Sequence, residues 1–352
     1  MKISLNCKLN PYGAYIFIMP LFSIKEIERI FVFRDDVAVD HHKIFYRVPR
    51  FKKFKLISQA YKLFQMLLLV PRDTRMSVGI YEIPHGLFAF IVGKIKRIPT
   101  TLCIISNPNN KNIWKGLRKT VTYFMLRRVD AITVTGSKSK KVLEMQGINT
   151  SKIHILPNSI DTKYFKPDLH VRKKYDIITL GSLLPGKNLL TFICIISLLK
   201  NIKPDLKVGI AGDGPERNNI IKKINELSLN NEIEFLGYIV NAKQFYNKGK
   251  VFVSTSLTEG LPRTVIEAMA CGIPCVVSNV GDMEDLIKNG INGFLIDNPY
   301  DKISFVNNIN ILLSDQAIYK KISKKACEST NNLYSIDAAI AVWKNIIRDI
   351  IY

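Results

Sequence analysis

Two glutamates separated by seven residues, Glu259 and Glu267, are suited to hold the hydroxyl groups of one extended ligand. Glu259 falls in an expected loop, whereas Glu267 falls in a short helix that Pro262 should begin and Gly272 should end. Even in a fully helical chain, eight residue steps of about 1.5 Å each span about 12 Å. A carboxylate can accept hydrogen bonds from two neighbouring hydroxyls, so the pair predicts a site that holds a hexose at one end and a ribose at the other. The alternative is a solvated Glu259 and a Glu267 engaged in an ion pair.

A lysine in a second loop could neutralise a diphosphate between two such sugars. Lys187 lies in the run Gly-Ser-Leu-Leu-Pro-Gly-Lys-Asn at 181–188, which follows an expected strand and opens an expected helix. Backbone N–H groups at a helix N-terminus and a lysine amine both favour phosphate oxygens. A surface lysine beside a Gly-Pro turn is the alternative.

Two further loops place glycines directly after expected strands. Gly212 and Gly214 permit a tight turn from a strand into a helix. Gly237 and Tyr238 could form a wall of a base pocket. Purely structural roles explain both loops about as well.

The elements that must position these loops alternate between strands and helices. In the second half, expected strands cover 176–180, 207–211, 233–236, 251–254 and 275–278, and expected helices cover 189–199, 216–227, 264–270 and 283–289. The first half has expected strands at 2–7, 44–48, 76–81, 101–106 and 131–135, with expected helices at 54–70 and 116–128. Repeated strand, turn and helix units predict parallel sheets covered on both faces, with right-handed crossovers. Ligands of such sheets bind beyond the carboxyl ends of the strands, where the four loops lie.

The bulk composition predicts two domains, without a membrane span or a disulfide framework. At 352 residues the chain exceeds the size at which a single core stops growing, and a linker is expected near 158–175. The six cysteines contain no C-x-x-C pair, which is typical of reduced thiols in a cytoplasmic protein. The longest apolar runs, 14–22 and 64–70, are far shorter than the roughly 20 residues that cross a bilayer. The N-terminus shows no cleavable signal pattern.

In this order along the chain, the loops resemble those of the retaining family 4 glycosyltransferases. The resemblance runs from about Tyr81 to the C-terminus, and Glu259 and Glu267 match the family's E-x7-E signature. The other matching segments are Asp130–Thr135 with Ser137, Leu156–Asp161, Gly281 with Glu284, and Asn292–Phe294. The resemblance implies an α/β fold of the GT-B class, with two facing Rossmann-like, doubly wound domains and an interdomain cleft. We expect an acceptor-binding domain at 1–165, a nucleotide-sugar-binding domain at 166–335, and a C-terminal helix at 336–352 that crosses back to the first domain.

The resemblance also implies a reaction. It is the transfer of a hexose-type sugar from a nucleotide diphosphate sugar to a saccharide or lipid-linked acceptor, in the synthesis of cell-surface polysaccharide or glycolipid. Glu259 should bind the donor sugar, Glu267 the ribose diol and Lys187 the diphosphate, with Glu259 and Lys187 as the catalytic pair. The donor-binding set is completed by Gly13, Ser182, Gly212, Gly214, Gly237, Tyr238, Gly260 and Leu261, the last two through their backbone. Front-face attack assisted by the leaving phosphate should retain the anomeric configuration, without a metal or other cofactor.

The sequence departs from the family's pattern in several places. Ser182 replaces the usual arginine beside the first glycine of the phosphate loop, and Arg263 is a candidate substitute. The usual glycine pair after the first strand is reduced to Gly13. No histidine follows the strand that ends near Ser106, although His85 lies one strand earlier and could act in the site or be an ordinary loop histidine. These departures leave open a non-catalytic nucleotide-sugar-binding relative and a GT-B sugar epimerase.

Positive charge is concentrated in the first half of the chain. Residues 1–165 contain 28 Lys and Arg against 10 Asp and Glu, whereas residues 166–352 contain 23 against 19. The aromatic residues Phe45, Phe51 and Phe54 are surrounded by Arg47, Arg50, Lys52, Lys53, Lys55 and Lys62. This pattern suits docking on anionic lipid and predicts a cytoplasmic enzyme held peripherally at the inner face of the cell membrane. A solvated charged surface is the alternative, and nucleic-acid binding is not expected because no helix-turn-helix, zinc finger or RNA-binding strand is recognisable.

Overall fold

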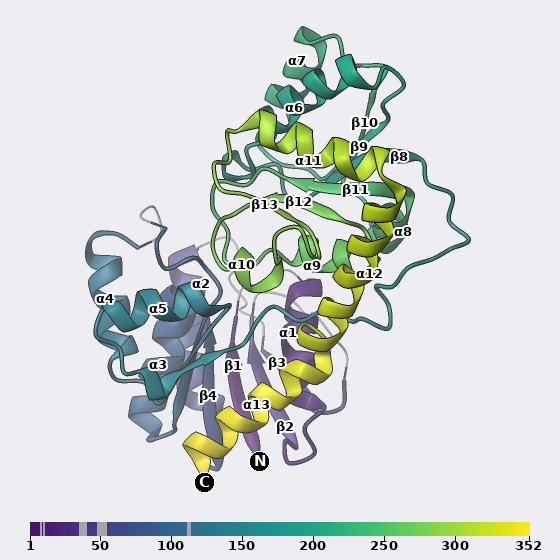
Figure 1. Ribbon diagram of the computed structural model, residues 1–352. Helices are drawn as coiled ribbons and strands as arrows, with labels where there is room; N and C mark the ends of the chain where they lie inside the picture. The colour runs from purple at the N-terminus through teal and green to yellow at the C-terminus, as the bar shows by residue number, and fades with distance from the viewer. Residues whose placement is uncertain (8, 10, 35–40, 48–54, 111–113) are drawn as a thin grey trace. The chain divides into compact units, whose positions relative to one another are not determined.

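The computed structural model describes the whole chain except residues 8, 10, 35–40, 48–54 and 111–113 (Figure 1). Contacts within the chain divide it into two compact units. The first unit comprises Met1–Ser159 together with Ile336–Tyr352, and the second comprises Ile160–Ser335. The linker expected at 158–175 contains the first of these division points.

The first unit is built on a seven-stranded parallel sheet, in the order β3-β2-β1-β4-β5-β6-β7. The strands are β1 (Lys2–Asn6), β2 (Arg29–Phe33), β3 (Ile44–Arg47), β4 (Thr74–Ile80), β5 (Thr100–Ile104), β6 (Ala131–Val134) and β7 (Ile153–Ile155). The helices are α1 (Pro11–Phe22), α2 (Lys55–Leu69), α3 (Leu87–Lys96), α4 (Gly116–Leu126), α5 (Ser137–Met145) and α13 (Ile336–Ile351), with short helical turns at Glu82–Gly86 and Thr150–Lys152. The direction of the connections reverses between β1 and β4, which makes the carboxyl ends of these two strands a topological switch point.

Helices cover both faces of the first sheet. Along β5, Cys103 faces a core that includes α1 and α13, whereas its neighbours Leu102 and Ile104 face a core that includes α3, α4 and α5. On the first of these faces Trp343 of α13 is fully buried and packs edge-on against Phe17 of α1, with ring centroids 6.0 Å apart. The alternation of side chains along a strand therefore sorts the helices into two layers.

The second unit has a six-stranded parallel sheet in the order β10-β9-β8-β11-β12-β13. Its strands are β8 (Tyr175–Leu180), β9 (Val208–Ala211), β10 (Ile233–Gly237), β11 (Gly249–Ser254), β12 (Cys275–Ser278) and β13 (Phe294–Ile296). Its helices are α6 (Leu189–Ile202), α7 (Arg217–Glu226), α8 (Ala242–Lys248), α9 (Arg263–Ala270), α10 (Met283–Leu286), α11 (Lys302–Ser314) and α12 (Gln316–Leu333), with a helical turn η3 at Pro185–Lys187. One core lies under α8, α9 and α12, and the other lies under α6, α7 and α11. The prediction of two doubly wound parallel sheets is confirmed.

Several elements differ from the sequence prediction. The structure adds β2, β7 and β13, and it adds the helices α1, α3, α5, α8, α11 and α12. Helix α10 ends at Leu286 rather than near residue 289. There the side chain of Asn292 accepts a hydrogen bond from the N–H of Lys288 and donates one to the carbonyl of Leu286, which holds a turn in place of a further helical turn.

Two bulk predictions can be compared with the described residues. No helix in that part of the chain is both long enough and apolar enough to cross a membrane. Cys103, Cys271 and Cys275 are free, buried thiols, and burial raises the pKa of Cys103 and of Cys271 to about 12. These thiols are therefore protonated and unreactive near neutral pH.

Candidate functional site

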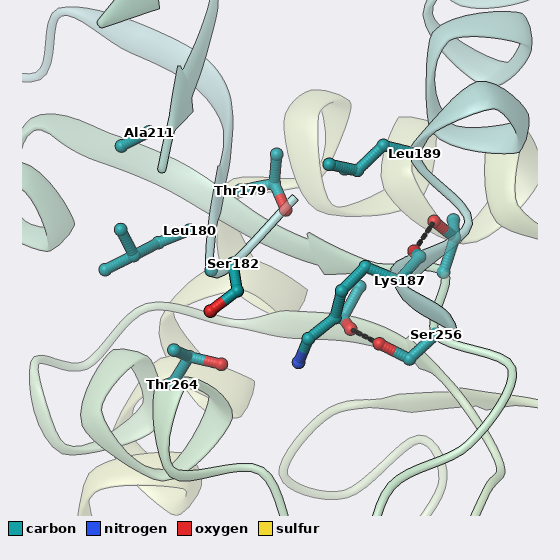
Figure 2. Close-up of a pocket in the computed structure, with 11 residues that line it drawn as sticks. Thr179, Leu180, Ser182, Lys187, Leu189, Ala211, Ser256 and Thr264 are labelled. Carbon is teal, nitrogen blue, oxygen red and sulfur yellow. Dashed lines mark hydrogen bonds between the residues drawn. The ribbon is translucent and has the colours of Figure 1, made fainter. Parts of the chain in front are cut away.

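The loops singled out in the sequence meet at the carboxyl edge of the second sheet. Strand β8 lies between β9 and β11, so the loops that follow these three strands are neighbours. They surround a small pocket, shown in Figure 2, into which Lys187 extends on the side of Ser182 and Thr264. The pocket is lined by Thr179, Leu180, Gly181, Ser182, Lys187, Leu189, Ala211, Ser254, Thr255, Ser256 and Thr264.

Glycine at position 212 lets two of these loops touch backbone to backbone. Gly212 has φ +136°, and a Cβ at this position would lie 1.8 Å from the carbonyl oxygen of Gly181. A Cβ on Gly214 would similarly lie 2.6 Å from the carbonyl oxygen of Leu183. The N–H of Gly212 donates to the carbonyl of Gly237 at 2.7 Å, which ties in the loop after β10. Side chains at 212 and 214 would therefore push the loops apart and reshape the pocket wall.

The turn that carries Lys187 is fixed by the loop after β11. The hydroxyl of Thr255 donates to the carbonyls of Lys187 at 3.2 Å and of Asn188 at 3.0 Å. The N–H of Leu257 donates to the carbonyl of Gly186 at 2.8 Å. Asn188 has a left-handed backbone (φ +52°) and joins the turn to the first residue of α6. The lysine thus leaves a rigid turn directly before the N-terminus of a 14-residue helix with no acid in its first turn.

Lys187 and Glu259 form an ion pair in this structure. The Lys187 Nζ lies 2.5 Å from Glu259 Oε1, and the two side chains are 26% and 15% exposed. The backbone that carries Glu259 is held by the loop after β12, because the N–H of Asp282 donates to the carbonyl of Gly260 at 2.9 Å. Gly281 makes this approach possible: a Cβ there would lie 2.2 Å from the carbonyl oxygen of Glu259. The predicted cationic and anionic side chains are therefore brought together by three separate loops.

Glu267 lies on the buried side of α9 and is 5% exposed. Its Oε2 accepts a hydrogen bond of 2.9 Å from the hydroxyl of Tyr246, which comes from α8 and is fully buried. Sequence reasoning missed Tyr246, since a tyrosine in a short helix gives no signal of its partner. Neither Glu259 nor Glu267 is among the residues that line the pocket of Figure 2.

The remaining predicted donor residues are spread around this edge. Ser182 lines the pocket. Leu261 is 2% exposed and its side chain belongs to the hydrophobic core. Gly237 has φ +65° with open space around it, and Tyr238 is 79% exposed, so neither is part of the pocket wall. Arg263, the candidate substitute for the missing arginine, is the first residue of α9 and also lies outside the set that lines the pocket.

Three predicted residues of the first unit are buried. Gly13, expected in the donor-binding set, is buried in the first turn of α1. His85 is 2% exposed, its Nδ1 lies 3.2 Å from Asn6 Oδ1, and its carbonyl accepts a hydrogen bond from the Asn6 side chain. Lys62, expected on a basic surface, is fully buried because it lies on the inner side of α2. Residues 48–54 of the same basic segment lie outside the described part.

A polar cluster at the end of β4 and β5 was not predicted. Ser106 donates to the buried carboxylate of Glu82 at 2.5 Å and accepts from Trp114 Nε1 at 3.3 Å. Arg118 lies 3.6 Å from the other oxygen of Glu82. The preceding residue, Tyr81, has φ +68°, an unusual value for a residue with a side chain. The sequence offered Ser106 only as the replacement for an expected histidine, so its acidic partner was not found.

Comparison with known proteins matches most of the second unit to one protein family. The model of the family described as glycosyl transferases group 1 matches residues 161–329. The chain is 28% identical over 323 residues to the Campylobacter jejuni GalNAc-alpha-(1->4)-GalNAc-alpha-(1->3)-diNAcBac-PP-undecaprenol alpha-1,4-N-acetyl-D-galactosaminyltransferase, covering 88% of this chain and 81% of the relative. It is 24% identical over 341 residues to the Escherichia coli UDP-Gal:alpha-D-GlcNAc-diphosphoundecaprenol alpha-1,3-galactosyltransferase, covering 90% and 86%.

Solved structures share the fold over nearly the whole chain. HepE of Anabaena in complex with UDP and glucose superposes with a TM-score of 0.85 at 17% identity, covering 99% of both chains. Sucrose-phosphate synthase of Thermosynechococcus elongatus superposes with a TM-score of 0.78 at 18% identity, covering 99% and 98%. At such identities the likeness establishes the fold, which is GT-B as predicted.

Proposed function

We propose that this chain, in which residues 161–329 match the model of the glycosyl transferases group 1 family, transfers a hexose-type sugar from a nucleotide diphosphate sugar bound by its second unit. The observation that carries the proposal is the meeting of Lys187 and Glu259 from two loops, with Glu267 further along the same segment. The positive charge of Lys187 and the two carboxylates fit the three parts of a donor: Glu259 fits the sugar, Lys187 the diphosphate and Glu267 the ribose.

Each of these side chains has a proposed part in donor binding. Lys187 turns from Glu259 to the diphosphate, where its ammonium and the N-terminus of α6 stabilise negative charge. Glu259, released from that ion pair, accepts hydrogen bonds from the hydroxyls of the donor sugar. Glu267 accepts from the ribose diol while the Tyr246 hydroxyl holds its carboxylate in place.

The same residues support a proposed course for the transfer. The bond between the anomeric carbon and the donor phosphate breaks, and its electron pair goes to the phosphate oxygen that Lys187 stabilises. The acceptor hydroxyl attacks from the face of the departing phosphate, which takes the hydroxyl proton, so that the configuration is retained. We propose that the lysine and the helix dipole suffice for the charge that develops, and that no metal ion is required.

The relatives indicate the classes of donor and acceptor. Two relatives are named for transfer of N-acetylgalactosamine or galactose to acceptors on undecaprenol diphosphate, and HepE was solved with UDP and glucose. We therefore propose a UDP-hexose donor and a saccharide or lipid-linked acceptor, in the synthesis of cell-surface polysaccharide or glycolipid. The excess of basic residues in the first half of the chain supports a place at the anionic inner face of the cell membrane.

A screen of nucleotide sugars by thermal shift tests donor binding. At a fixed concentration, a bound donor stabilises the folded chain by an amount that grows with the logarithm of its affinity. One UDP-hexose should therefore raise the unfolding temperature more than the other UDP-sugars do. Analysis of the product by NMR then gives the anomeric configuration, and a product with inverted configuration would contradict the proposed course. The absence of any shift with every UDP-sugar would contradict the assignment of the donor.

A second candidate is a relative that binds the nucleotide sugar without transferring it. Ser182 in the pocket wall supplies no positive charge where the family usually has arginine, and this observation favours weaker stabilisation of a leaving diphosphate. The two candidates differ in turnover. The binding protein would be favoured if the donor stabilised the chain but no UDP were released in the presence of extracts that contain lipid-linked saccharides. A product epimerised at the sugar would favour an epimerase.

A further inference from the structure

Helix α2 carries large apolar side chains on its solvent side. Ile57, Phe64 and Leu68 are spaced by seven and four residues, which places them on one side of the helix, and they are 53%, 55% and 64% exposed. The opposite side, which includes Lys62 and Met66, is fully buried. Contiguous exposed apolar side chains of this size mark a surface that is covered by something else in use.

Neighbouring helices extend this apolar surface. Helix α3 contacts α2 on one side and α4 on the other, so the three form one layer on the sheet. The layer also exposes Ile95 of α3, and Leu117 and Phe124 of α4. The ring of Phe124 packs edge-on against the buried ring of Phe90 of α3, with centroids 6.3 Å apart, which joins the two helices. We call the outer side of α2, α3 and α4 the basic-apolar face.

The basic-apolar face is free of acidic side chains. The chain has no Asp or Glu from 41 to 72 or from 83 to 129, which include all three helices. Exposed cations lie among the apolar residues, among them Lys94, Lys119 and Arg128. The guanidinium carbon of Arg128 lies 3.8 Å from the centre of the Phe124 ring. These helices therefore expose both apolar and cationic groups and carry no acid of their own, although Arg118 of α4 lies 3.6 Å from the carboxylate of Glu82.

This combination selects one kind of partner. A second copy of the chain would bring like charges together on this face, which disfavours association. A nucleic acid would match the cations but would leave Phe64 and Leu68 against a polar backbone. An anionic bilayer satisfies both, because aliphatic and aromatic side chains enter the boundary between headgroups and acyl chains while cations contact the phosphates.

We propose that the basic-apolar face docks the enzyme on an anionic lipid bilayer, with Phe64 and Leu68 inserted and with Lys119 and Arg128 against the headgroups. The inference rests on the proposed function, which places the acceptor on a lipid, and it deepens that proposal by naming the surface. Of the segment first expected to dock, Lys62 is buried, and residues 48–54 lie outside the described part.

Flotation of the full chain with vesicles tests the proposal. Vesicles of phosphatidylglycerol mixed with phosphatidylcholine should bind the protein at low salt, and vesicles of phosphatidylcholine alone should bind it at least about tenfold more weakly. The double variant Phe64→Ser, Leu68→Ser should bind the mixed vesicles about tenfold or more weakly. A matched double variant on the second unit, Ile303→Ser with Leu333→Ser, removes side chains that are 60% and 58% exposed and should bind like the wild type.

A charge variant and a donor-binding measurement complete the design. Lys119→Glu and Arg128→Glu should each weaken vesicle binding by about fivefold or more, and added salt should reduce the difference from the wild type. The proposal would be overturned if the Phe64→Ser, Leu68→Ser variant bound the vesicles as well as the wild type does. It would also be overturned if the wild type formed a dimer that these two substitutions dissociate. UDP-induced thermal stabilisation is read on the same samples: its absence in the wild type contradicts the proposed function, whereas its presence with unchanged vesicle binding contradicts only the docking face.

Discussion

Replacement of Lys187 by methionine distinguishes the contribution of this side chain to donor binding from its contribution to the stability of the fold. The ammonium lies 2.5 Å from Glu259 Oε1, and both side chains are more than two thirds buried. Removing it leaves the carboxylate without this partner, which should lower the free energy of unfolding by about 1–2 kcal/mol. In the donor complex the lost interaction is a hydrogen bond between charged groups, worth about 1.5–3 kcal/mol. UDP should therefore bind Lys187→Met about 10- to 150-fold more weakly, as measured by isothermal titration calorimetry.

The second unit offers a matched control for this variant. Lys200 forms an ion pair of 3.0 Å with Glu232, with side chains 36% and 9% exposed, away from the residues that line the pocket. Lys200→Met should lose a similar amount of stability and should bind UDP like the wild type. The reasoning is refuted if Lys187→Met binds UDP with wild-type affinity, or if both variants lose affinity equally.

Three further substitutions examine the same site. Glu259→Gln should bind UDP as tightly as the wild type or up to about tenfold more tightly, because Lys187 no longer has to break an ion pair with a carboxylate to reach the diphosphate. The transfer rate of this variant should fall by about 100-fold or more, and a parallel loss of UDP affinity would contradict the reasoning. Tyr246→Phe removes the hydrogen bond to Glu267 and should weaken UDP binding by about 3- to 10-fold in calorimetry, whereas binding of inorganic diphosphate should stay unchanged if Glu267 holds the ribose. Gly281→Ala should lower the unfolding temperature more than Gly147→Ala. Both glycines have positive φ, but only at position 281 would an added Cβ collide with backbone atoms. Equal decreases in unfolding temperature would show that the close approach at Gly281 is not needed.

The loops of the second unit could be predicted because their signals are local. A glycine directly after a strand or a lysine before a helix is visible in a few residues, and the structure brings Lys187 and Glu259 into contact. Partners that come from distant elements give no such signal. Tyr246 lies in α8 and its partner Glu267 lies in α9, whereas Glu82 follows β4 and its partner Ser106 follows β5. Neither contact could therefore be inferred from spacing.

The first unit shows the limit of charge counting. The basic run around Lys62 was interpreted as one exposed surface, yet the helical period turns Lys62 inward and turns Phe64 and Leu68 outward. Helix α1 was missed because Ala14, Ile16 and Ile18 are all buried, which leaves no alternation of polar and apolar residues to reveal a helical period.

The arrangement of the two domains and the positions of the donor residues stay predictions. The central claim is that one cation and two carboxylates hold opposite ends of an activated hexose. A crystal structure of the full chain with UDP-glucose tests it most directly. We expect Lys187 Nζ within about 3 Å of a diphosphate oxygen, Glu259 on the glucose and Glu267 on the ribose hydroxyls. A structure in which the ion pair of Lys187 and Glu259 stays intact, with the diphosphate bound elsewhere, would contradict the claim.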